Sequence, residues 1–128
     1  MKQENNSELK VVTKAQELAV HTIKITSNCN KFPKKYRFTL CDRMQNKAMT
    51  IYELLLEANR TKLSDIAERS CLQTKAITSC DELLFYIEMC LQLQIIEPNS
   101  AEYWSKLVSD IKFMAIKWRS KDKERYSA

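Results

Sequence analysis

The chain has 128 residues, a formal net charge of +5 at neutral pH and no glycine. A chain of this length suits one domain with a hydrophobic core of its own, and we expect one domain over residues 1–128. Hairpin turns and phosphate-binding loops depend heavily on glycine, so its absence argues against sheet architectures and glycine-rich nucleotide loops. The composition therefore predicts an all-α protein.

The first two predicted helices are defined by apolar residues that recur every three or four positions. The first helix covers about residues 8–29, and its seam is Val11, Ala15, Leu18, Thr22, Ile25 and Cys29. The second covers about residues 34–60 and follows Pro33, since proline is well tolerated at the first turn of a helix. Its seam is Leu40, Met44, Ile51, Leu55 and Ala58.

Two further helices follow. The third covers about residues 62–95, with the seam Ile66, Ile77, Cys80, Leu84, Ile87 and Leu91. Pro98 is expected to stop it, and the fourth covers about residues 100–120, with the seam Trp104, Leu107, Ile111, Met114 and Trp118. The tail 121–128 loses the apolar period, which predicts disorder. Short connections make successive helices antiparallel, so we expect an up-down-up-down four-helix bundle.

The cysteines and the N-terminus indicate a cytoplasmic protein. The five cysteines are odd in number, include no Cys-x-x-Cys pair and fall mostly at apolar positions, which is typical of reduced core thiols. The first ten residues, "MKQENNSELK", are polar, so we expect no export signal. No apolar run approaches the roughly 20 residues of a membrane span.

Residues suited to catalysis or metal binding are scarce. His21 is the single histidine, and a surface or half-buried role is favoured over a role as ligand or base. Di-metal helical bundles need Glu-x-x-His pairs on two helices, which one histidine cannot supply. Glu53 and Glu57 flank the second seam and are interpreted as a solvated face. We therefore expect no catalytic residue, no metal, no cofactor and no enzymatic activity.

Positive charge is concentrated near the first connection. Residues 1–47 carry a net charge of +6 and residues 48–97 a net charge of −4. The stretch 30–47 holds six Lys or Arg and one Asp, interleaved with Phe32, Tyr36 and Phe38. Cations and aromatics together can pair phosphates and stack bases. The alternative is that Phe32 and Phe38 plug the end of the bundle, which leaves Tyr36 as the freest of the three.

The same region carries a resemblance to a known family. The run "VVTKAQELAVHTIKITSNCNKFPKKYRFTLCDRMQNKAMTIYELLLEANR" has a helix that ends before "FPK", an aromatic-rich start "YRF" and a long aliphatic helix closing in "EANR". It resembles the four-helix-bundle family of 23S ribosomal RNA intervening-sequence proteins and accessory variability determinant (Avd) proteins of diversity-generating retroelements. Intervening-sequence proteins typically carry Ser-Ile-Pro and Glu-Gly late in the second helix, whereas "MTIYELLLEANRTK" lacks proline and glycine and is more similar to the Avd branch.

The resemblance implies a non-enzymatic partner of a reverse transcriptase. Avd proteins are basic homopentamers that bind the reverse transcriptase and template RNA, with DNA as a second candidate ligand here. Lys34, Arg37 and Arg43 match basic family positions around "FPK", and Arg60 matches the end of "EAN". Lys31, Lys35 and Lys47 are added on charge alone, and Tyr36 for stacking. The predicted interface is Lys31, Lys34, Lys35, Tyr36, Arg37, Arg43, Lys47 and Arg60.

Apolar residues outside the main seams lend separate support to an oligomer. They predict a second apolar face on some helices, and they are Val12, Ile23, Tyr52, Leu83, Tyr86, Met89 and Trp104. A wider core in a monomer is the alternative. Two other functions also stay open: an intervening-sequence-type bundle of unknown partner, and a helical protein-interaction module that binds no nucleic acid.

Overall fold

The computed structural model describes the backbone of residues 2–128 and the side chains of residues 8–128. The chain forms four long helices, which are α1 (Lys2–Thr26), α2 (Asp42–Arg60), α3 (Ile66–Gln92) and α4 (Pro98–Ser127). Three short helical turns lie between them, η1 (Lys34–Tyr36) and η2 (Arg37–Cys41) before α2 and η3 (Leu63–Asp65) before α3. No strand occurs over residues 2–128, so the all-α prediction is confirmed.

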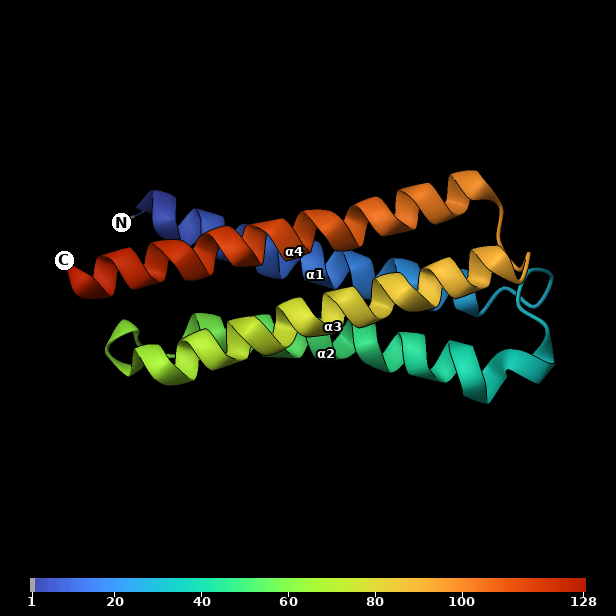
Figure 1. Cartoon of the computed structure of the whole chain (residues 1–128), viewed down its shortest axis with the longest axis horizontal. Helices are drawn as coiled ribbons and strands as arrows, with labels where there is room; N and C mark the ends of the chain where they lie inside the picture. The colour runs from blue at the N-terminus through green and yellow to red at the C-terminus, as the bar shows by residue number, and fades with distance from the viewer. Residues whose placement is uncertain (1) are drawn as a thin grey trace.

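Successive helices run in opposite directions along one long axis (Figure 1). Each helix contacts the next along the chain, and α1 also contacts α4, so the four helices surround a common core. The start of α1, the α2–α3 connection and the end of α4 lie together at one end, called the terminal end below (Figure 1). The other two connections lie at the opposite end. Over residues 2–128, none of the helices combines the length and the apolar content that crossing a bilayer requires.

The core follows the predicted seams closely on α2 and less closely on α3. All five residues predicted for the seam of the second helix are buried, Leu40 in η2 and the other four in α2. On α3, Cys80 and Ile87 are fully buried as predicted, but Leu84 is only partly buried. Leu83 and Cys90 are fully buried as well, each three residues after Cys80 or Ile87, and so are Gln73 and Ala76 nearer the start of α3. Because α3 is apolar on more than one side, the pattern alone placed part of its seam one residue too far along.

Trp104 lies in the middle of the core. Its side chain is fully buried, and its indole Nε1 donates a hydrogen bond to Thr22 Oγ1 at 3.1 Å. Leu83 and Val12 are buried as well, so these three residues belong to the core of one subunit instead of a second apolar face. Ile23 differs from them because 40% of its surface is exposed. The wider-core interpretation therefore accounts for part of the predicted second face.

The helix ends differ from the prediction in several places. Helix α1 ends at Thr26, so the predicted seam residue Cys29 lies outside it and is exposed, α2 begins at Asp42 instead of residue 34, and α3 covers Ile66–Gln92 instead of 62–95. Helix α1 begins at Lys2, before the expected residue 8, and Pro98 begins α4 instead of stopping α3. Helix α4 continues to Ser127, so the prediction of a disordered tail over 121–128 is wrong. The helix continues through this tail because Asp122 is fully buried and accepts hydrogen bonds from Arg69 Nε and Gln73 Nε2, both at 2.7 Å. These bonds hold the last turns of α4 against α3.

Asp122 belongs to a group of buried charged and polar side chains at the terminal end, called the ionic cluster, which is Glu8, Arg69, Gln73 and Asp122. Arg69 Nη2 lies 2.8 Å from Glu8 Oε1, and Arg69 Nη1 donates to the backbone oxygen of Thr61 at 2.8 Å. Burial by itself lowers the pKa of Arg69, but the hydrogen bonds and charges of Asp122 and Glu8 outweigh it and raise the pKa overall. One guanidinium thereby connects α1, the α2–α3 connection, α3 and α4.

Candidate nucleic-acid interface

The α1–α2 connection turns without glycine because Asn28 organises its backbone. The N–H groups of Lys31 and Phe32 donate to the backbone oxygen of Asn28 at 3.0 and 2.9 Å. The N–H of Asn30 donates to the side-chain Oδ1 of Asn28 at 3.0 Å, a local bond that asparagine offers in turns. Phe32 is only 4% exposed and packs into the core. Phe32 therefore anchors the connection, and Lys31 beside it stays exposed.

The chain re-enters the helix through two tight turns. Pro33 precedes η1 with a φ of −58°, the value its ring imposes, and accepts a hydrogen bond from Tyr36 N–H at 3.0 Å. In η2 the N–H of Asp42 donates to the oxygen of Arg37, five residues earlier, which is the spacing of a π turn. This turn is wider than an α-helical turn by one residue.

The wide turn has a physical reason in the sequence. Leu40 and Cys41 are both buried, and Arg37 precedes them by three and four residues. In an unbroken α-helix these spacings would put Arg37 on the same buried face. Burying an unpaired guanidinium is unfavourable. In η2 the backbone departs from the α-helix, Leu40 and Cys41 are buried and Arg37 stays exposed.

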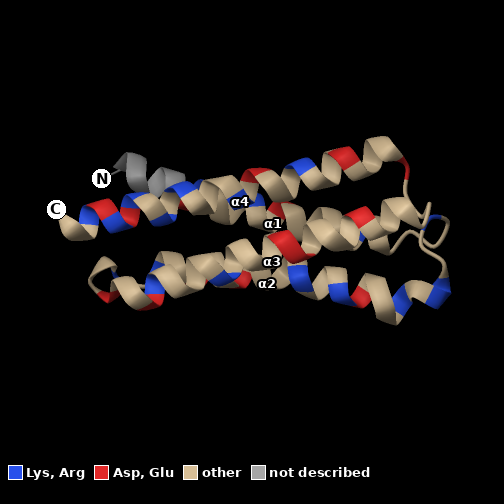
Figure 2. Ribbon diagram, in the orientation of Figure 1, with Lys and Arg blue, Asp and Glu red and all other residues tan. Residues whose placement is uncertain are grey.

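Five exposed cations lie around these turns and define the basic end: Lys31, Lys34, Lys35, Arg37 and Arg43. Figure 2 shows blue segments in the α1–α2 connection and along the first part of α2. Among residues 8–128, no carboxylate forms an ion pair with any of the five. Lys35 Nζ lies 5.2 Å from the centre of the Tyr36 ring, a cation–π contact. The basic end therefore presents five positive charges that no ion pair among residues 8–128 neutralises.

Two predicted interface residues lie apart from this group. Lys47 is further along α2, and its Nζ pairs with Glu82 Oε1 on α3 at 2.9 Å. Arg60 is the last residue of α2, about 26 Å from Arg43 along the helix at 1.5 Å per residue, and so lies at the terminal end. The structure brings the five cations of the basic end together, and it leaves Lys47 partly neutralised and Arg60 distant.

The three aromatic side chains of residues 30–47 differ in their exposure to solvent. Phe32 is buried, Tyr36 is half-buried and Phe38 is 75% exposed. The prediction that Tyr36 is the freest is therefore wrong, and Phe38 does not plug the bundle. A signal for this was present in the sequence. Phe38 precedes Leu40 by two residues, which is about 200° around a helix, so it had to point away from the seam.

The cysteines show no activated thiol in the core. Cys41, Cys80 and Cys90 are buried. Burial raises the pKa of Cys80 and of Cys90 to about 12, and burial followed by the charge of Asp42 raises the pKa of Cys41. These three side chains stay protonated at neutral pH, and a protonated thiol is a poor nucleophile. Cys29 and Cys71 are exposed, so the expectation of core thiols holds for three of the five.

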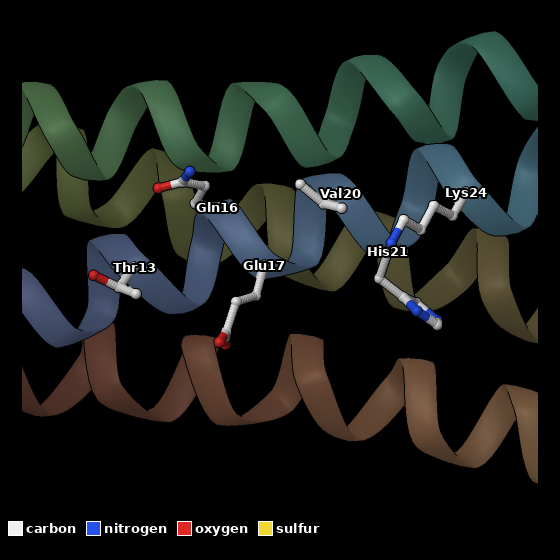
Figure 3. A pocket seen from close by; sticks show the side chains of 6 residues that line it. All are labelled: Thr13, Gln16, Glu17, Val20, His21 and Lys24. Carbon is white, nitrogen blue, oxygen red and sulfur yellow. The ribbon is translucent and has the colours of Figure 1, made fainter.

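A hollow of about 410 Å³ lies over α1 and is lined by Thr13, Gln16, Glu17, Val20, His21 and Lys24 (Figure 3). Glu17 and His21 both extend toward α4, and no hydrogen bond joins them among the described residues (Figure 3). The His21 ring meets the Tyr103 ring edge-on at 5.2 Å, and burial, with the charge of Lys24, lowers its pKa. Over residues 8–128 no cluster of three or more metal-ligating side chains occurs. The hollow presents no convergent catalytic set.

Comparisons of the chain with protein-family models, with curated proteins and with solved structures gave no match.

Proposed function

We propose that this protein is a non-enzymatic accessory protein of a diversity-generating retroelement, of the Avd type. In this proposal it binds RNA through the basic end and docks on the reverse transcriptase, in support of mutagenic reverse transcription in the cytoplasm. One observation carries the proposal: five exposed cations at one end of a helical bundle have no carboxylate partner among residues 8–128. These cations include Lys34, Arg37 and Arg43, the positions through which the sequence resembles the family.

The arrangement of charge supports a polyanionic ligand over a merely hydrated surface. On α3, Asp81 pairs with Lys112 at 2.6 Å and Glu82 pairs with Lys47 at 2.9 Å, so acidic side chains meet the lysines of both neighbouring helices. The basic end has no such counterpart in the described side chains. Unpaired cations that gather in one place raise the local concentration of anions and accelerate their association. Phosphates of a nucleic acid suit this surface.

We extend the proposal to a cyclic homopentamer. Exposed aliphatic side chains support it: Leu9, Val20 and Ile23 along α1 are 53%, 47% and 40% exposed, and Met49 of the neighbouring α2 is 37% exposed. A ring of subunits would cover such a surface and repeat the basic end, which multiplies weak phosphate contacts. Light scattering then gives about 75 kDa, five times the 15.0 kDa of one chain.

The proposal is tested by removing the charge of the basic end. Joint replacement Lys34→Gln, Lys35→Gln, Arg37→Gln and Arg43→Gln is expected to abolish retention of single-stranded RNA in a mobility-shift assay. In the unsubstituted protein, log K falls with log[salt] with a slope of about −0.7 per neutralised phosphate, so loss of four contacts removes up to about three units of slope. Circular dichroism and the mass by light scattering are expected to stay unchanged.

A charge-matched control separates this surface from net charge. Lys62, Lys117, Lys121 and Lys123 are exposed on or near the terminal end, and their joint replacement by Gln removes the same four charges. RNA retention is expected to survive in this control. Equal losses in both variants would mean that net charge, not the basic end, binds RNA. A gene for a reverse transcriptase beside a pair of sequence repeats, next to the gene of this protein, separates the retroelement assignment from the other helical-bundle functions.

A further inference from the structure

Phe38 is the most exposed large apolar side chain of the described residues, at 75%. Single exposed apolar residues are common on protein surfaces and need no explanation by themselves. Phe38 differs from Phe85 and Phe113, which are 60% and 63% exposed, in what surrounds it along the chain. Both of those lie on the outer faces of long regular helices, whereas Phe38 lies in the π turn between Arg37 and Cys41.

The π turn fixes where Phe38 points. The buried Leu40 and Cys41 hold the end of the turn against the core, and the hydrogen bond from Asp42 N–H to the Arg37 oxygen closes it. Phe38 is therefore carried on an anchored backbone instead of a loose loop. A rigid aromatic ring loses little conformational freedom when it binds a flat ligand. Wide turns of this kind also recur at functional sites.

The surroundings of Phe38 select the kind of flat ligand. Lys34, Lys35, Arg37 and Arg43 are exposed within five residues of it on either side, and none has an ion pair among residues 8–128. A surface that offers an exposed ring beside unpaired cations can stack a base on the ring and hold the adjoining phosphates. A duplex presents its phosphates but keeps its base faces stacked inside, so a ring can stack only on unpaired bases.

From this geometry we infer that Phe38 is a base-stacking platform, so the basic end binds single-stranded nucleic acid with unpaired bases in preference to duplex. The inference rests on the proposed function, since it specifies the ligand of the same surface. It assigns the phosphate contacts to the lysines and arginines of the basic end and the discrimination between single strand and duplex to Phe38.

The test uses the full chain and three probes that carry equal numbers of phosphates per strand. The first is a labelled mixed-sequence RNA of about 12 nucleotides, a length within the site sizes of single-strand binders. The second is the same strand in duplex with its complement, and the third is an abasic strand of equal length. Fluorescence anisotropy measures the dissociation constant of each. The unsubstituted protein is expected to bind the single strand roughly five- to 150-fold more tightly than the abasic strand, the usual range for stacking one base.

Two substitutions at Phe38 and one at Phe113 separate the contribution of the Phe38 ring to binding from that of the surrounding charge. Phe38→Leu keeps an apolar side chain without a π face, and it is expected to remove the preference for the single strand while leaving abasic-strand affinity within about twofold. Phe38→Trp keeps an aromatic face and is expected to retain the preference. Phe113→Leu is the matched control, because Phe113 is exposed and lies 5.9 Å from Lys112 Nζ, yet belongs to α4. It is expected to bind like the unsubstituted protein.

The outcomes separate this inference from the proposed function. Equal affinity for all three probes, or equal effects of Phe38→Leu and Phe113→Leu, overturns the stacking role and leaves RNA binding by the basic end standing. Absence of binding to any probe overturns both. If Phe38→Leu weakens binding to a protein partner while leaving all three probes unaffected, the ring is a protein contact and the inference is wrong. Circular dichroism of each variant confirms that helicity is intact.

Discussion

The two ends of the bundle use the same kinds of charged side chains in opposite ways. At the terminal end, Arg69 is 5% exposed, and the carboxylates of Glu8 and Asp122 meet its guanidinium. At the basic end, five Lys and Arg side chains are exposed and have no carboxylate partner among residues 8–128. The comparison shows that a charged residue is either held inside the fold or left exposed to solvent according to whether its partner lies within the chain.

The physical difference between the ends is desolvation. Buried charges are tolerated only while each has its partner, because their interaction is strong in the interior and an unpaired member is costly. Such a cluster fixes the positions of α1, α3 and α4 relative to one another. Exposed cations keep their hydration and contribute little to folding. They therefore stay available for an external anion.

Removing Arg69 is expected to have the largest effect of the predictions that compare the two ends. Arg69→Met keeps much of the volume but leaves the buried Glu8 and Asp122 with only Arg125, whose partly exposed Nη1 lies 3.5 and 3.3 Å from them, so the expected loss of unfolding free energy is about 3 kcal/mol. Urea denaturation followed by circular dichroism measures it. Lys106→Met is the exposed comparison, because its pair with Asp110 is 71% and 44% exposed, and the expected change is within about 0.5 kcal/mol.

A triple replacement tests whether the loss comes from unpaired charge. Adding Glu8→Gln and Asp122→Asn to Arg69→Met removes both buried negative charges, and this is expected to recover more than half of the lost stability. No recovery would mean that the guanidinium acts through shape alone, and the contrast between the ends would then not be one of charge.

Replacing Phe32, the apolar anchor of the α1–α2 connection, is expected to have an intermediate effect on stability. Phe32 is buried, so Phe32→Leu leaves a poorly filled site and is expected to lower the free energy of unfolding by about 1 kcal/mol. Phe113→Leu, on an exposed ring, is expected to change it by less than about 0.5 kcal/mol. Equal urea midpoints for the two variants would contradict the assignment of Phe32 as an anchor.

The smallest effect on stability is expected where the effect on binding is largest. The joint replacement of Lys34, Lys35, Arg37 and Arg43 by Gln touches only exposed side chains that form no ion pair with any of residues 8–128. Its total effect on the free energy of unfolding is expected to lie within about 0.5 kcal/mol, because release of mutual repulsion offsets the small losses expected at exposed sites. A summed loss above about 3 kcal/mol in urea denaturation would show that these cations are structural, and the comparison between the two ends would fail.

Parts of the fold were predictable because they depend on local repetition. The five residues predicted for the seam of the second helix, from Leu40 to Ala58, are all buried, and the prediction missed only the small Ala48 and Cys41 between them, since α2 has one apolar stripe between polar faces. The α3 seam was displaced because Leu83 and Leu84 are equally apolar neighbours, and only packing against the adjacent helices buries the first fully. The α4 tail was missed for a related reason: its anchor, Asp122, is polar and invisible to an apolar pattern.

The residues of the candidate interface were also predicted only in part. Five cations close together in sequence are close together in space, because the short connection and first turn of α2 hold them at one end. Arg60 was grouped with them through the family resemblance, although the length of α2 separates it from the rest. Phe38 was left out of the predicted interface because plugging of the bundle end was set against base stacking and Tyr36 was taken as the freest ring, although the two-residue spacing from Leu40 places Phe38 on the other side of a helix.

Helicity, the number of long helices and the clustering of positive charge around residues 31–43 follow from the amino-acid sequence alone, because the seam period and the lack of glycine act over a few residues. Only the tertiary structure decided which charges are buried and which have no ion pair among residues 8–128. It also decided which aromatic ring stays exposed to solvent. Arg69 meets Asp122 across 53 positions of the chain, and no local pattern reports such a partner. The pairing of charges and the burial of side chains depend on neighbours that folding brings together. They can therefore be identified only once the helices are packed.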